Sequence, residues 1–284
     1  ERGLAMGINE GMGYLGVAAT TVLAARLADG NLAVHPFALA GGILLLGLLL
    51  TLWAVPETNP HAHPTSGPLA SPAPQRPPLK AIWAETSWRH PALSAMTVGG
   101  LVNKLADTVA WGLLPLFLAQ RGLPVSQIAW VSGVYGAAWG AGQFFTGPLS
   151  DAAGRRLPIA VGFWLLGTGL WGLTQVHGYA WWLVVAGVAG LGMALLYPNL
   201  NAAVADYAEP ASRGAVLGVY RLWRDGGYAI GAVCLGVLAA GQGTEVAILA
   251  VAALSGMTGS LLARRLAARV SPVAAGSVME DGTI

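Results

Sequence analysis

The sequence GPLSDAAGRR, at residues 147–156, separates two long apolar stretches of the chain. Gly154 permits a tight turn, because glycine adopts positive φ values without strain. Arg155 and Arg156 are suited to binding the anionic inner surface of a membrane. Asp151 is placed to meet the positive N-terminal end of a helix. The stretch therefore predicts a short cytoplasmic turn between two membrane helices, although an ordinary basic turn between helices has the same ingredients.

The composition on both sides of this turn excludes a water-soluble globular protein. Hydrophobic residues make up 55% of the 284 residues, charged residues make up only 10%, and the mean hydropathy is +0.60. A soluble protein has about 25% charged residues, because its surface needs them. The net charge of +2 does not indicate a nucleic-acid partner, and none is expected. Cys234 is the only cysteine, so no intrachain disulfide is expected.

Eight stretches of the chain are long and apolar enough to cross a membrane, which takes roughly 20 mostly apolar residues. The expected spans are residues 4–27, 36–55, 93–118, 125–150, 157–176, 179–205, 213–240 and 245–266. The only long polar stretch lies between the second and third spans. It is rich in proline and lacks helical periodicity, which predicts an extended linker between two membrane halves.

Basic residues are distributed unequally between the two ends of these spans. If residue 1 is cytoplasmic, only Arg26 and Arg121 lie on the far side of the membrane. The cytoplasmic side then holds Arg2, Arg76, Lys80, Arg89, Arg155, Arg156, Arg213, Arg264, Arg265 and Arg269. Cytoplasmic loops carry an excess of Lys and Arg. Both ends of this chain are therefore expected in the cytoplasm, and the protein is expected in the plasma (inner) membrane.

The turn at residues 147–156 resembles the cytoplasmic loop signature of the major facilitator superfamily, Gly-x-Leu-x-Asp-x-x-Gly-Arg-Arg. Three further features are similar to the same superfamily. They are Arg-Gly-x-x-x-Gly at the start of the first and seventh spans, Val55-Pro56-Glu57-Thr58 at the end of the second, and the proline-rich linker. The stretch from Tyr220 to Tyr228 resembles exporters associated with resistance to nickel and other toxic compounds.

This resemblance implies an all-α polytopic membrane fold of twelve helices in two six-helix domains. The chain would then lack the first four helices and hold helices five to twelve. Residues 1–55 would end the first domain, residues 56–91 would be a cytoplasmic linker, residues 92–270 would form the second domain, and residues 271–284 would be a cytoplasmic tail. The loop residues that the resemblance connects with gating are Gly147, Asp151, Gly154, Arg155 and Arg156.

Two groups of charged residues fall within expected spans. In the third span, Asp107 neighbours Asn103 and Lys104 on the helix surface. It lies roughly 16 Å from the end of that span, near the middle of a bilayer. In the seventh span, one face carries Arg221, Arg224 and Asp225, and both groups are expected to be buried.

A charge at the centre of a membrane helix costs about 2.5–3.5 kcal/mol on insertion scales, so such residues normally face a polar cavity or one another. These residues are therefore candidates for handling a substrate or a proton. Asp107 is the first choice for a titrating carboxylate, followed by Glu10 and Asp225. A mutually neutralising structural ion network is the alternative.

Proline marks a third candidate, Tyr197-Pro198-Asn199 in the sixth span, which is followed by Asn201. Proline frees a carbonyl one turn back, and freed backbone groups at membrane depth line a cavity or are satisfied by neighbours. Pro115 in the third span has the same property. A simple packing kink is the competing interpretation. Glycines four residues apart, such as Gly227 and Gly231, indicate close packing of helices.

Two patterns resemble an enzyme or metal site but lack the other elements that such a site needs. Residues 11–16, GMGYLG, match the dinucleotide-binding fingerprint, but that motif needs a preceding strand, and this copy lies inside an expected membrane helix. His61 and His63 provide only half of a zinc site. Neither an enzymatic activity nor a cofactor or metal is expected.

The combined features predict a secondary active transporter that moves a small solute by alternating access. A proton-coupled exporter of a drug, a metal or another toxic compound fits the resemblance best. The expected partners are the lipid bilayer, a small-molecule or ion substrate, and protons. The alternatives are an uptake permease of the same fold, a receptor or assembly protein without transport activity, and an inactive fragment.

Overall fold

The computed structural model describes residues 2–27, 34–54 and 77–266, without the side chains of residues 2–10, 34 and 151–153. This part of the chain is helical throughout apart from short connections, and it contains no strand. The elements are α1 (Arg2–Leu27), α2 (Val34–Ala54), α3 (Leu79–Ala84), η2 (Glu85–Arg89), α4 (Pro91–Thr108), η3 (Val109–Leu113), α5 (Leu114–Gln120), α6 (Val125–Ala153), α7 (Arg156–Gln175), α8 (Tyr179–Tyr207), α9 (Arg213–Gln242) and α10 (Thr244–Arg265).

Every expected span coincides with a long helix to within a few residues. The third span comprises α4, the π-helical segment η3 and α5, which together form a helix of 30 residues from Pro91 to Gln120. Within the described residues, five helices are long and apolar enough to cross a membrane, namely α2, the α4–α5 helix, α7, α8 and α10. The all-α polytopic fold expected from the sequence is confirmed.

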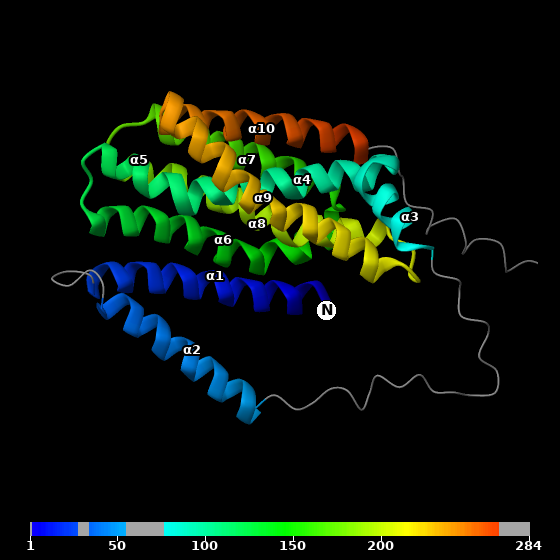
Figure 1. Ribbon diagram of the computed structural model, residues 1–284, viewed down its shortest axis with the longest axis horizontal. Coiled ribbons are helices and arrows are strands. Elements are labelled where there is room, and N and C mark those ends of the chain that lie inside the picture. Colours follow the sequence, from blue (N-terminus) through cyan, green and yellow to red (C-terminus); the bar gives the residue numbers. More distant parts are fainter. Residues whose placement is uncertain (1, 28–33, 55–76, 267–284) are drawn as a thin grey trace, which may run out of the picture.

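The helices lie side by side in an elongated bundle (Figure 1). In the bundle, α6 packs between α1 and α8, α7 packs between α8 and α10, and α4 packs on α9 and α10. The second helix, α2, slants away from the bundle (Figure 1), and none of its most apolar window is buried. Trp53 at the end of α2 is 87% exposed, and Phe145 on α6 is 75% exposed. Such apolar surface is expected on helices that face lipid or other membrane helices.

Glycine allows α9 to lie close against α4, as its spacing predicts. A Cβ atom added at Gly227 would meet the backbone oxygen of Leu101 at 2.7 Å, and one added at Gly231 would meet Thr108 Oγ1 at 2.7 Å. Both distances are shorter than van der Waals contact, so no larger residue fits without a shift. This contact brings the middle of α9 to the charged residues of α4.

The expectation of an extended linker is wrong for its last part, because residues 79–89 form α3 and η2. This part begins after Pro78, the last proline before His90, so no proline interrupts it. It also has apolar residues that can be buried, such as Ile82, which is 7% exposed. Trp223 on α9 donates a hydrogen bond from Nε1 to Ser87 Oγ at 2.9 Å. Residues 55–76, with the pair His61 and His63, lie outside the described residues, as does the expected tail at 271–284.

The turn between α6 and α7 has the geometry that its glycine predicts. Gly154 has φ 77°, a value that glycine adopts without strain. Arg155 pairs with Asp206 at the end of α8, with 3.3 Å between Nε and Oδ2, and also bonds to Ser150. Arg156 donates from Nε to the backbone oxygen of Ala263 on α10 at 2.8 Å. The two arginines therefore tie the turn to the ends of α8 and α10.

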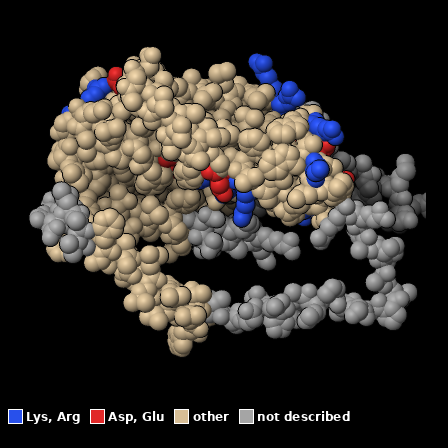
Figure 2. All heavy atoms as spheres, viewed as in Figure 1, with Lys and Arg blue, Asp and Glu red and all other residues tan. Residues whose placement is uncertain are grey.

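Basic side chains collect at this end of the bundle. Figure 2 shows most of the blue side chains at the end where α3 lies in Figure 1, with a smaller group beside a red neighbour at the opposite end. At that opposite end, Arg121 after α5 pairs with Glu245 on α10. The two ends of the bundle thus differ in charge in the way the sequence predicts.

Candidate functional site

A buried ion pair forms the centre of the candidate site. Lys104 and Asp107 lie one turn apart on α4, with 2.8 Å between Lys104 Nζ and Asp107 Oδ2. Their side chains are only 4% and 1% exposed. Two opposite charges at this distance and depth stabilise each other strongly, because little water is present to screen them. The sequence prediction that these residues are neighbours is confirmed.

Asp107 also accepts hydrogen bonds from three neutral donors on other parts of the fold. Trp111 in η3 donates from Nε1 to Oδ1 at 2.9 Å. Tyr135 on α6 donates its hydroxyl to Oδ1 at 3.4 Å, and Tyr228 on α9 donates its hydroxyl to Oδ2. The carboxylate is therefore held from α4, η3, α6 and α9 together, and each of its oxygens has at least two donors.

Aromatic rings surround the ammonium group of Lys104. Its Nζ lies 4.7 Å from the ring centroid of Tyr228, 5.4 Å from that of Tyr197 and 5.7 Å from that of Trp139. All three distances are within the range of cation–π attraction. We call Tyr228, Tyr197 and Trp139 the aromatic cage. Tyr14 on α1 stacks on Trp139 with 3.5 Å between ring centroids, so α1 packs against the aromatic cage at Trp139.

The helix that carries the ion pair is locally irregular. The π-helical segment Val109–Leu113 begins directly after Thr108. Pro115 lies two residues beyond it and cannot donate to the carbonyl of Trp111, four residues earlier. Single π-helical turns within α-helices are frequent at functional sites. In this case the segment contains Trp111, whose indole N–H bonds to Asp107.

A second charged pair on α9 joins the site through Tyr197. Arg224 donates from Nε to Asp225 Oδ1 at 2.8 Å, and its guanidinium carbon lies 5.0 Å from the Tyr197 centroid. Arg224 is 7% exposed, but the Asp225 side chain is 53% exposed, and Arg221 is exposed as well. The expectation that all three are buried is therefore wrong for Arg221 and Asp225, because that side of α9 packs on none of the described helices.

The sequence model of the Major Facilitator Superfamily matches residues 96–279, which include every residue of the ion pair and the aromatic cage. The chain belongs to the Major Facilitator Superfamily. This superfamily consists of multi-pass membrane transporters rather than enzymes.

Curated relatives within this superfamily carry the name "Uncharacterized MFS-type transporter YcaD". They include proteins of Salmonella arizonae, Salmonella newport and Salmonella heidelberg, each 30% identical to the chain over 124 residues. The matched part is 44% of this chain and 32% of each relative, so the chain matches about a third of their length.

Only some of the candidate residues predicted from the sequence contact the ion pair or belong to the aromatic cage. Tyr197 does, as part of the aromatic cage. Asn103 is buried on α4 but donates from Nδ2 to Met193 Sδ at 3.1 Å, away from Asp107. Asn199 donates to the backbone oxygen of Leu195 at 2.6 Å, so its amide is bound within α8 and does not reach the ion pair. The side chains of Glu10 and Asp151 lie outside the described residues.

Sequence reasoning missed four aromatic residues of the site, of which one is Tyr228 on α9. The spacing of the other three contains a signal. Trp111 lies four residues after Asp107, and Tyr135 and Trp139 lie four residues apart on α6. Residues four apart share a helix face. An aromatic residue one turn from an intramembrane carboxylate therefore indicates a hydrogen-bond donor for it. Which aromatic residues of α6 and α9 meet α4 could not be read from the sequence.

A polar column runs along one face of α6, and every member is buried. Its residues are spaced by three or four positions and are Ser132, Tyr135, Trp139, Gln143, Thr146 and Ser150. Among the described residues, no partner is found for Trp139 Nε1 or for either amide atom of Gln143, nor for the hydroxyls of Ser132 and Thr146. A buried polar group without a partner lowers stability. The unpaired groups of the column are therefore expected to lower the stability of the fold. The column runs from the level of Asp107 to the turn at Gly154.

Gln143→Leu is expected to raise the thermal stability of the protein, because the described residues provide no hydrogen-bond partner for this buried amide. An unsatisfied buried polar group costs about 1–3 kcal/mol, and leucine has a similar volume. Thermal unfolding in detergent would measure the change. Gln242→Leu, at the exposed end of α9, is the control and is expected to have little effect. A loss of stability in Gln143→Leu alone would contradict this description of the column.

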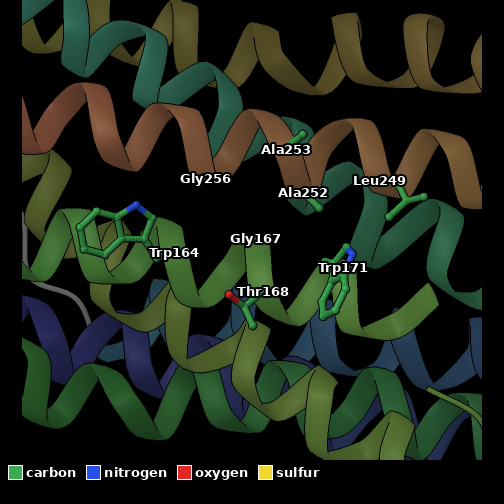
Figure 3. Close-up of a pocket in the computed structure, with 8 residues that line it drawn as sticks. All are labelled: Trp164, Gly167, Thr168, Trp171, Leu249, Ala252, Ala253 and Gly256. Atoms are coloured by element: carbon green, nitrogen blue, oxygen red, sulfur yellow. The ribbon is translucent and has the colours of Figure 1, made fainter. Parts of the chain in front are cut away.

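A groove of about 540 Å³ lies elsewhere in the fold, between α7 and α10 (Figure 3). It is lined by Trp164, Gly167, Thr168, Trp171, Leu249, Ala252, Ala253 and Gly256. None of these residues is charged, and none belongs to the ion pair or the aromatic cage. The groove therefore contributes nothing to the chemistry of the candidate site.

Proposed function

We propose that this protein is a secondary active transporter that moves a small solute by alternating access and binds it at the Lys104–Asp107 pair. The observation that carries the proposal is a buried ion pair walled by aromatic rings from three further helices. In a family of membrane transporters, such a polar centre is the natural place for a solute.

The position of the pair within its helix supports this function. Asp107 is roughly 20 Å from Gln120 and roughly 24 Å from Pro91 at about 1.5 Å rise per residue. It is therefore near the middle of a helix long enough to cross the bilayer. Ionisable residues at that depth are expensive and generally serve a substrate or proton pathway.

We also propose that transport is coupled to protons and directed outward, with a drug, a metal or another toxic compound as the solute. Asp107 is the proposed proton carrier, because a proton on this carboxylate removes its attraction for Lys104. Changes in such a pair can bias which side of the membrane the site faces. Residues 1–55 and 92–270 are the proposed halves of this rocking motion, and the loop residues at 147–156 are proposed to hold its cytoplasmic gate.

Proton coupling can be tested on the purified protein in proteoliposomes that contain a pH indicator. Organic cations, divalent metals and organic anions would be added one class at a time. We expect one class to move protons across the membrane, with flux that stops when the pH gradient is collapsed. A solute flux that continues unchanged without the gradient contradicts proton coupling.

The topology is open to a labelling test. We expect Lys80→Cys on α3 to react with an impermeant maleimide only from the cytoplasmic side, because the basic residues lie at that end of the bundle. Gln242→Cys, at the other end of α9, is expected to react only from outside. Both changes are made in a Cys234→Ser background, since Cys234 is exposed. Labelling of position 80 only from outside would invert the proposed orientation.

A further inference from the structure

The surroundings of Lys104 match those that bind a ligand cation. Three aromatic rings lie 4.7 to 5.7 Å from its ammonium nitrogen. Aromatic rings attract a cation at these distances, most strongly when it is desolvated, and cages of such rings recognise quaternary ammonium ligands. Lys104 is 3% exposed, so its ammonium group is largely desolvated. The group in the cage is the protein's own cation.

Asp107 has hydrogen-bond donors besides Lys104 to hold its position. Trp111, Tyr135 and Tyr228 each donate a hydrogen bond to the carboxylate. Hydrogen bonds to an ionised group are stronger than those between neutral groups. The carboxylate would therefore keep three hydrogen-bond donors if the ammonium of Lys104 moved away.

The side chain of Lys104 is also flexible enough to leave the cage. Its charge is at the end of a flexible four-carbon stem, unlike the rigid planar fork of an arginine. One wall of the cage borders the surface, because Tyr228 is 41% exposed. Asp225 lies one turn before Tyr228 on α9, and its side chain is 53% exposed. An incoming cation would thus meet an exposed carboxylate first, then the Tyr228 ring, then Asp107.

We propose that Asp107 and the aromatic cage bind an organic cation, a protonated or quaternary amine with apolar substituents, and that the Lys104 ammonium occupies this site until the substrate displaces it. The inference rests on the proposed function, because it names the substrate class of the same site. Binding exchanges one ammonium for another at Asp107, and no covalent bond changes. The alternative is that Lys104 and Arg224 bind an anionic substrate, and the test distinguishes the two cases.

Lys104→Met removes the internal competitor and keeps an unbranched side chain of similar size. We expect the protein in detergent to bind benzyltrimethylammonium at least about tenfold more tightly after this change, measured by isothermal titration calorimetry. Adding Asp107→Asn in the same background should return binding to the weak level of the unmodified protein. Lys80→Met, at the chain's other lysine, is the matched control and should change nothing, since Lys80 is exposed on α3. Unchanged or weaker cation binding in Lys104→Met overturns the proposal, as does tight binding of benzenesulfonate that Lys104→Met abolishes.

A pair of variants at Tyr228 keeps the proposal testable if Lys104→Met does not fold. Tyr228→Phe keeps the ring, whereas Tyr228→Leu removes it, and both keep the Lys104–Asp107 pair. Because Lys104 loses the same ring, the cation–π contributions of the two ammonium groups largely cancel, but the benzyl group also loses its own ring contact. We therefore expect Phe to bind benzyltrimethylammonium like the unmodified protein and Leu to bind it about threefold to tenfold more weakly. Equal affinity in the Phe and Leu variants would overturn the role of the cage.

Transport measurements separate this inference from the proposed function. Benzyltrimethylammonium that binds as expected, but does not cross proteoliposome membranes under any gradient, would refute transport and leave the cation site standing. Gradient-driven transport of another solute, with cation binding indifferent to Lys104 and Tyr228, would refute the cation site and leave the transporter standing.

Discussion

Asp107→Asn is expected to abolish transport driven by a pH gradient, while exchange of solute at raised concentration stays detectable. The amide keeps the size of the side chain and an oxygen that can accept from Trp111 and Tyr135, but it cannot carry a proton between its two states. The gradient then has no group through which to act. Gradient-driven flux and energy-independent counterflow, measured in the same proteoliposomes, would check both parts of this expectation.

A second change at Lys104 separates a coupling role from a purely structural one. Asp107→Asn alone leaves a buried ammonium without its counter-charge, and breaking such a pair typically costs about 3–5 kcal/mol. Lys104→Met with Asp107→Asn leaves no lone charge, so stability should return in either case. If the pair is only structural, activity should return with stability. Full pH-dependent transport in the double variant would rule out Asp107 as the coupling carboxylate.

The membrane helices could be predicted from the sequence because length and hydropathy are local properties. The expected span at residues 179–205 is observed as Tyr179–Tyr207, and that at 213–240 as Arg213–Gln242. The ion pair could be predicted for the same reason, since Lys104 and Asp107 lie on one turn of one helix. Gly154 marked its turn because a positive φ favours glycine.

The aromatic cage could not be predicted because its members come from three different helices. Trp139, Tyr197 and Tyr228 approach Lys104 only when α6, α8 and α9 pack around α4. That packing depends on long-range contacts that composition and periodicity do not specify. The burial of Arg224 beside an exposed Arg221 has the same origin, because only the neighbours of α9 decide which of its faces is covered.

Gly227→Ala is expected to destabilise the fold and to disturb the site, whereas Gly226→Ala is expected to stabilise or leave it unchanged. In an isolated helix the two changes are equivalent, and each would gain up to about 1 kcal/mol from the better helix propensity of alanine. Their surroundings differ. An added Cβ at Gly226 meets nothing within 4 Å, but one at Gly227 lies 2.7 Å from Leu101 O and 2.9 Å from Lys104 Cβ.

The clash at Gly227 pushes α9 away from α4 at the level of the ion pair. Overpacking of this kind costs about 1–3 kcal/mol, so thermal unfolding in detergent should show Gly227→Ala below the unmodified protein and Gly226→Ala at or above it. The shift also moves Tyr228, the next residue, away from Lys104 and Asp107, both of which it contacts. Transport should therefore fall in Gly227→Ala even at temperatures where the protein stays folded. Equal stability and equal transport in the two alanine variants would mean that α9 does not lie against α4 in this way, and the cage would lose the wall that Tyr228 provides.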